Sequence, residues 1–239
     1  MVACENEPMA TRAATDTSID PRIPLYRLDT DLYRRFVEAG MLGGAGVELV
    51  DGLLVERDGQ HPDSIHRLNL DTYNRMVATG LLEDEPVELL DGLLAEMSPQ
   101  GVGHFDAILR LTRHFAQARA WLMVQLPLEL GSRGEPEPDL ALVERPSREH
   151  LPRTALLAIE VAVSSHAKDR GPKAELYAQS GIPTYWLVDV PAQTIEVRTD
   201  PGPEGYARCE TYGLGTKVPS PADGVADLDV SRLFDDHDA

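Results

Sequence analysis

Apolar residues along the chain fall into short runs that predict β-strands, separated by stretches with helical spacing. The run Leu156–Val163 has the length of a strand and is apolar except at Glu160. Such runs are typical of strands buried on both faces in the middle of an α/β sheet. Further strands are predicted at residues 123–130, 139–143, 184–189, 194–199 and 206–211.

Two stretches, one before these strands and one among them, predict helices. In residues 104–122 apolar side chains recur at steps of three and four, which indicates one buried helical face. In the stretch that follows Glu160, Pro172 suits the first helical position and Gly181 suits the end. The order of helix, three strands, helix and strand predicts an α/β (α+β) fold with a mixed central sheet flanked by helices.

Upstream of this core lies an internal repeat. Residues 27–56 align without gaps on residues 67–96, and 16 of the 30 positions are identical. Each copy predicts a helix ending at Gly40 or Gly80, followed by a β-hairpin with an Asp-Gly turn. We expect the first copy to be a tandem duplication that extends the sheet edge, forms a partner surface, or only packs against the domain.

These patterns predict four segments. The first residues are small, polar and contain proline, which is typical of a disordered tail. We predict a disordered tail over residues 1–24, a duplicated helix–hairpin unit over 25–66, the main domain over 67–234 and an acidic tail over 235–239.

The composition indicates a globular protein with no membrane association. The chain has 239 residues, of which 42% are hydrophobic, enough for a sizeable core. No apolar stretch approaches the roughly 20 residues that span a bilayer, and no basic start precedes an apolar run. Cys4 and Cys209 lack metal-site spacing and do not suggest a disulfide framework, so a reducing, cytoplasmic location is expected.

The net charge opposes binding to nucleic acid. The chain carries 22 basic and 40 acidic residues, a formal net charge of −18. Because non-specific binding to nucleic acid depends on Lys and Arg neutralising phosphates, a DNA-binding chain of this kind needs a local basic patch or a divalent metal ion.

Two carboxylates on neighbouring predicted strands are the main chemical feature. An isolated ionised Glu160 within an apolar strand would cost several kcal/mol, so it requires a metal ion, a lysine or hydrogen-bond donors. Asp139 stands at the start of the preceding strand, after Pro138, a position that tolerates proline. Together they could form an oxygen-rich site for a hard divalent cation. The alternative is a structural ion pair and a turn-capping aspartate.

Basic residues gather at the start of the predicted helix that follows Glu160. Lys168, Arg170 and Lys173 lie where the helix dipole disfavours a cation by about 0.3–1 kcal/mol. Three basic residues at a position that disfavours positive charge indicate an anionic partner, either a phosphate or the two carboxylates.

Several segments occur together in one order along roughly residues 67–234. They are Val87–Gly92, Ser98–His104, Glu137–Leu140, Ile159–Val161 with Ser164–Ser165, Asp169–Lys173 and Gly181–Asp189. In order and spacing they resemble the Uma-two family of the PD-(D/E)XK restriction-endonuclease-like superfamily. The resemblance implies a restriction-endonuclease-like core, preceded here by the helix–hairpin duplication.

The resemblance also implies roles for individual residues. Asp139 and Glu160 would bind Mg²⁺ or Mn²⁺ together with the Val161 carbonyl, and Lys173 would orient a water or stabilise charge on the phosphate. The lysine that the superfamily carries two residues after its glutamate is Ala162 here. Lys173 must therefore reach the site from the next helix.

Two further residues are candidates for the same site. Glu88 could be a third carboxylate around the metal, or an exposed hairpin residue. His104 could be a metal ligand, a phosphate contact or a general base, since imidazole titrates near neutral pH, or only a helix-terminal residue.

These observations predict a Mg²⁺-dependent endonuclease that hydrolyses DNA phosphodiester bonds and forms a homodimer. The alternative is a catalytically silent nuclease-fold module used in binding or assembly, which the acidic charge, Ala162 and the duplicated hairpin favour. Cleavage of RNA is a third possibility that the sequence does not separate from the first.

Overall fold

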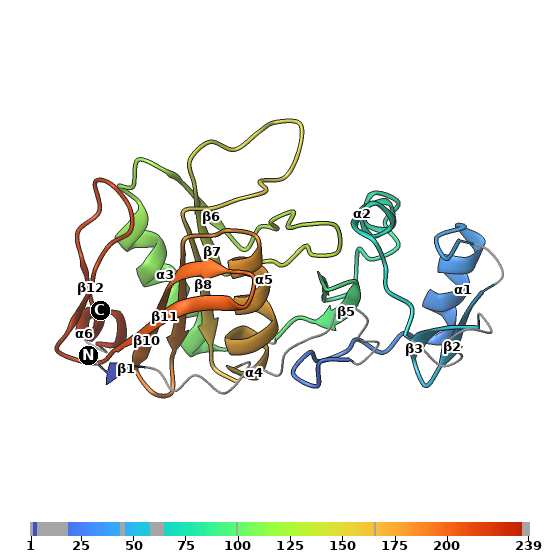
Figure 1. The fold of residues 1–239 in the computed structure, drawn as a ribbon, viewed down its shortest axis with the longest axis horizontal. Coiled ribbons are helices and arrows are strands. Elements are labelled where there is room, and N and C mark those ends of the chain that lie inside the picture. The colour runs from blue at the N-terminus through green and yellow to red at the C-terminus, as the bar shows by residue number, and fades with distance from the viewer. Residues whose placement is uncertain are drawn as a thin grey trace. The chain divides into compact units, whose positions relative to one another are not determined.

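The computed structural model describes residues 2–3, 19–43, 46–57, 65–98, 100–164 and 166–235. They belong to two compact units (Figure 1). Unit 1 comprises residues 1–10, 98–130 and 136–239, and unit 2 comprises residues 11–97 and 131–135.

Unit 1 is built on a seven-stranded mixed sheet. All neighbouring strands are antiparallel except β8 and β9, which are parallel and joined by a helical crossover. The strand order is β1 (Val2–Ala3), β11 (Gly205–Tyr212), β10 (Thr194–Gly202), β9 (Thr184–Asp189), β8 (Leu157–Ala162), β7 (Leu140–Val143) and β6 (Trp121–Val124). This sheet confirms the predicted α/β class and the order of its core elements.

Helices cover both faces of this sheet (Figure 1). Because side chains alternate along a strand, Ile159 and Val161 of β8 pack on the side of α3, whereas Ala158 and Ala162 pack on the side of α5. The remaining elements of unit 1 are α3 (Val102–Phe115), α4 (His166–Lys168), η1 (Asp169–Lys173), α5 (Ala174–Gln179), β12 (Lys217–Val218), β13 (Leu228–Asp229) and α6 (Val230–Phe234).

Both predicted helices of the core have different bounds in the structure. The helix predicted over residues 104–122 ends at Phe115, because the chain must turn to enter β6 at Trp121. The second helical stretch begins at His166 instead of Pro172. Pro172 lies within the π-helical turn η1, between α4 and α5.

Unit 2 contains the two repeat copies as separate helix–hairpin elements. Both Asp-Gly turns have positive φ at both residues, 49° and 76° at Asp51-Gly52 and 48° and 78° at Asp91-Gly92, as two-residue hairpins require. The predicted helix and hairpin of each copy are thereby confirmed. Their elements are α1 (Thr30–Glu38), β2 (Val47–Val50), β3 (Leu53–Glu56), α2 (Leu70–Ala78), β4 (Val87–Leu90) and β5 (Leu93–Glu96).

The two copies share one hydrophobic core. Leu32, Phe36 and Leu54 of the first copy are buried in the same cluster as Met76 and Leu94 of the second. The structure therefore divides the chain differently from the boundary predicted between residues 66 and 67. The first copy also does not extend the sheet edge, because its hairpin forms a separate two-stranded sheet.

The predicted tails differ from the structure where it describes them. Val2–Ala3 pair with Thr211 and Glu210 of β11, and Ile23 is buried, so these parts of residues 1–24 are ordered by backbone pairing and burial. Residues 4–18 and 236–239 lie outside the described residues. Cys209 is disulfide-bonded, so the expectation that the cysteines form no disulfide is wrong.

Substitution of Gly92 by alanine should destabilise the protein more than the same change at Gly40. Both glycines have positive φ, which costs a residue with a side chain about 1–2 kcal/mol. A Cβ at Gly92 would also lie 2.8 Å from the Leu68 carbonyl oxygen, whereas one at Gly40 would meet no atom within 4 Å. We expect the overlap to add about 1–3 kcal/mol for Gly92→Ala, measured as the free energy of unfolding in urea. Equal losses for the two variants would contradict this.

Candidate active site

The carboxylate of Glu160 lies in the centre of unit 1 and has two donors on one oxygen. It is 4% exposed, in the middle of β8. Its Oε1 lies 2.9 Å from the Lys173 Nζ and accepts a hydrogen bond of 2.6 Å from the Tyr177 hydroxyl. The predicted need for a partner to this buried charge is thereby met by an ammonium group and a phenol.

Lys173 and Tyr177 come from one helical stretch and are four residues apart, so they lie on the same face. Lys173 is 3% exposed at the end of η1, and Tyr177 is fully buried in α5. Ala162, the last residue of β8, stands at the position of the superfamily lysine and is fully buried on the side of this helix. Lys173 thus places an ammonium group beside Glu160, although Ala162 stands at the position of the superfamily lysine.

Asp139 stands immediately before β7 and is held by two groups. Its Oδ2 accepts a hydrogen bond of 2.8 Å from the Val161 backbone N–H, and its Oδ1 lies 3.0 Å from the His104 Nε2. His104 is 7% exposed in the first turn of α3. Its other ring nitrogen, Nδ1, is buried without a hydrogen-bond partner among the described residues.

The two carboxylates occupy facing positions on adjacent strands. Leu140 of β7 is paired with Ile159 of β8, and continuing this register by one residue sets Asp139 opposite Glu160. Asp139 is contacted by His104 of α3, which covers one face of the sheet. Glu160 is contacted by Lys173 of the helical stretch that covers the other face. The structure therefore brings four predicted residues together as two pairs, linked through Val161.

Two of the basic residues at the helix start, Arg170 and Lys173, have carboxylates of the sheet as partners. Arg170 Nε donates to Glu196 Oε1 at 2.7 Å, and its Nη2 donates to Asp189 Oδ2 at 3.1 Å. Burial by itself raises the pKa of Asp189, but the Ala192 backbone N–H, His166 and Arg170 outweigh it and lower that pKa below its ordinary 3.8. This pairing stabilises the fold at neutral pH, and its contribution is lost as the pH falls from 3.8 towards the folded-state pKa.

This second ion-pair network was not predicted from the sequence. The sequence places Arg170 in a basic cluster and does not indicate its partner. Glu196 stands in a segment of alternating polar and apolar residues, so it lacks the signal of a single charge in an apolar run that identifies Glu160.

Glu88 belongs to unit 2 and not to the group of side chains just described. It is 2% exposed in β4, so the alternative of an exposed hairpin residue is wrong. Its counterpart in the first copy, Glu48, has a side chain that is 45% exposed and lies 3.4 Å from Arg57. One reason for the deeper burial of Glu88 is that its strand, β4, also forms a bridge between Leu89 and Glu135. Glu88 as a metal ligand stays a prediction.

The residues present provide donors of the right kind for a hard divalent cation. Within the described residues no three His, Cys, Asp or Glu side chains are arranged to hold a metal. Asp139 and Glu160 nevertheless supply carboxylate oxygens at facing positions, and the Val161 carbonyl lies in the same strand. Oxygen donors of these types suit Mg²⁺ or Mn²⁺. The donor set therefore fits such an ion, with Asp139, Glu160 and Val161 as the residues that would hold it.

A family model described as "Uma2: Putative restriction endonuclease" matches residues 70–231, more than half of the sequence. The chain belongs to the Uma2 family. The match confirms the family resemblance found in the sequence. It begins at the first residue of α2, so the Uma2 match includes the helix and hairpin of the second copy and none of the first.

A solved structure has the same fold as this Uma2 chain. It is titled "Crystal structure of a putative nuclease belonging to DUF820 from Anabaena variabilis ATCC 29413", and the two are 21% identical with a TM-score of 0.56. The likeness covers 70% of this chain and 97% of the other. No curated protein matches the chain.

The helices within the described residues are too short or too polar to cross a membrane. The cytoplasmic location stays a prediction.

The ion pair between Lys173 and Glu160 should show strong coupling in a double-mutant cycle. Removing one partner leaves the other charge buried, so Lys173→Met and Glu160→Gln should each lower the free energy of unfolding by about 3–5 kcal/mol. The double variant should lose less than the sum, by about 1–3 kcal/mol. Tyr177→Phe, which removes one hydrogen bond to a charged group, should cost about 1.5–3 kcal/mol. Additive losses in urea unfolding would show that the pair is not coupled.

Proposed function

We propose that this Uma2 protein is a metal-dependent endonuclease that hydrolyses DNA phosphodiester bonds at Asp139, Glu160 and Lys173. The observation that carries the proposal is the contact of 2.9 Å between Lys173 and Glu160. It supports the proposal because Lys173 reaches the carboxylate from another helix, although the expected lysine is replaced by Ala162.

Each side chain has a role that its surroundings allow. Asp139 and Glu160 would hold the divalent cation, which when bound polarises a phosphate and lowers the pKa of a bound water. Lys173 offers an ammonium group that can orient a water or stabilise negative charge on the phosphate. Tyr177 donates to the Glu160 oxygen that faces Lys173 and so holds the carboxylate in place.

His104 has one ring nitrogen against Asp139 and the other buried beside the same site. Its Nε2 faces Asp139, which orients the ring, and its Nδ1 has no partner among the described residues. An imidazole held in this way by a carboxylate can accept or deliver a proton. His104 is therefore proposed as the residue that moves a proton during hydrolysis.

The second candidate function is a catalytically silent binding module, which the net charge of −18 favours. DNA binding by so acidic a chain should depend strongly on the divalent metal and weaken with salt. A chain that binds neither metal nor DNA would support the silent module.

The proposal predicts loss of both metal binding and cleavage on neutralising the carboxylates. We expect calorimetry to detect Mn²⁺ or Mg²⁺ binding to the wild type and none to Asp139→Asn with Glu160→Gln. With supercoiled plasmid and metal, Asp139→Asn should abolish cleavage, and Lys173→Met should slow it by about 10²-fold or more. Far-UV circular dichroism should show that the variants remain folded.

Two matched controls distinguish the site from general effects of charge. Lys217→Met changes an exposed lysine on β12 and should leave cleavage unchanged. Glu88→Gln tests the predicted third carboxylate against Glu48→Gln, its counterpart in the first copy. Unchanged cleavage by Asp139→Asn would contradict the assignment, and absence of metal binding to the wild type would contradict the enzymatic function.

A further inference from the structure

The two repeat copies of unit 2 contact each other in a reciprocal way. Each copy is preceded by a short lead segment, Leu25–Tyr26 for the first and Ile65–His66 for the second. Leu25 forms an antiparallel bridge with Ala95 of the second copy, and Ile65 forms one with Val55 of the first. The two bridges are equivalent, because each residue of one is 40 positions from its counterpart in the other.

Backbone hydrogen bonds repeat this exchange. The Tyr26 N–H donates to the Leu94 carbonyl at 2.8 Å, and the His66 N–H donates to the Leu54 carbonyl at 2.8 Å. Each lead segment thus pairs, through one bridge and one of these hydrogen bonds, with the second strand of the other copy's hairpin. A twofold exchange of this kind is the arrangement of an isologous interface between two identical subunits.

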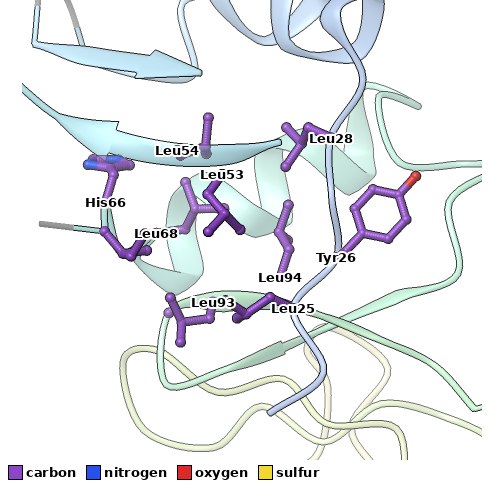
Figure 2. A pocket seen from close by; sticks show the side chains of 11 residues that line it. Leu25, Tyr26, Leu28, Leu53, Leu54, His66, Leu68, Leu93 and Leu94 are labelled. Atoms are coloured by element: carbon purple, nitrogen blue, oxygen red, sulfur yellow. The ribbon is translucent and has the colours of Figure 1, made fainter. Parts of the chain in front are cut away.

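Side chains at the centre of unit 2 follow the same symmetry (Figure 2). A cavity of about 20 Å³, room for about one water molecule, lies between the copies. Its lining residues come mostly in pairs 40 positions apart: Leu25 and Ile65, Tyr26 and His66, Leu28 and Leu68, Leu53 and Leu93, Leu54 and Leu94. The leucines of both hairpins meet across this centre.

Internal contacts of each copy are also matched. Tyr33 donates to the Val47 carbonyl at 3.0 Å, and Tyr73 donates to the Val87 carbonyl at 3.3 Å. These contacts hold the helix of each copy against its own hairpin. Each copy is therefore a complete folding element except for the face that it turns to the other.

One copy alone would leave that face exposed. The second copy would present Leu68, ahead of α2, and Leu93 and Leu94 of its hairpin to water, with an unpaired strand edge at Ala95. Apolar patches and open strand edges of this kind lead proteins to associate. In this chain the first copy covers both features.

We propose that this face of the second copy is a twofold docking surface for another copy of the same helix–hairpin, and that the first copy occupies it from within the chain. The Uma2 match supports this, because it begins at residue 70 and includes only one helix–hairpin. A chain with a single copy would pair Ile65 with Ala95 of a second chain, twice. The proposal does not depend on nuclease activity.

The twofold symmetry is approximate, and its departures favour the partner within the chain. Arg35 of the first copy donates to the Gly80 carbonyl at 3.3 Å and to the Leu81 carbonyl at 3.4 Å. Within the described residues, the second copy has a further bridge, between Leu89 and Glu135, that the first copy lacks. The full chain is therefore closed at this surface.

Deletion of residues 25–64 tests the proposal, because it removes one 40-residue period and joins Pro24 to Ile65. Ile65 then takes the place of Leu25 in the sequence. We expect light scattering after size exclusion to show twice as many chains per particle as for the full chain. The same deletion with Leu94→Asp should lose this association. A folded deletion variant with the association state of the full chain would overturn the proposal.

A full-chain variant decides the matter if the deletion variant does not fold. Leu54→Asp places a charge of the first copy in the shared core and should release that copy from the second. We expect a twofold rise in chains per particle at micromolar concentration, reversed in Leu54→Asp with Leu94→Asp. A folded Leu54→Asp chain with unchanged association, or one that folds at no concentration, would overturn the proposal.

Discussion

The ion pair between Glu160 and Lys173 is the constraint on which unit 1 depends. A carboxylate in the middle of a strand whose six residues are all buried is tolerable only with charge and hydrogen bonds around it. Lys173 and Tyr177 supply both, and they do so from a helical stretch interrupted by a π-turn. Turns of this type occur often at functional sites, because the extra residue redirects the side chains that follow.

The second carboxylate is held from the opposite face of the sheet. Asp139 engages the His104 ring of α3 and the backbone of β8, so two helices on different faces converge at the junction of β7 and β8. This arrangement holds two acidic groups in neighbouring positions without leaving either unpaired. A catalytic constellation needs such support, since its side chains must be held in place before the substrate arrives.

Duplication has affected the two copies of unit 2 differently. The hairpin of the second copy gains a backbone bridge to Glu135, and its Glu88 is buried, whereas the equivalent Glu48 is close to half exposed. The same short sequence therefore has two environments in one chain. Chemistry at Glu88 and packing by the first copy are compatible with this division.

The sequence by itself determined the local elements and the chemical candidates. Periodicity placed β9 at Thr184–Asp189, the Asp-Gly turns placed both hairpins, and one charge in an apolar run identified Glu160 as a residue that needs a partner. These features depend on neighbouring residues, so a short window contains the information. The family segments identified Asp139, Lys173 and His104 as members of one site.

Only the tertiary structure decided which of these residues meet. The contacts of the site join segments that are 13 to 35 positions apart in the sequence. They are the pairings of His104 with Asp139, of Lys173 and Tyr177 with Glu160, and of Arg170 with Glu196. Such contacts follow from strand order and from the faces that the helices cover, neither of which any single segment contains. The same reason explains the repeat, whose two copies were visible in the sequence while their reciprocal pairing was not.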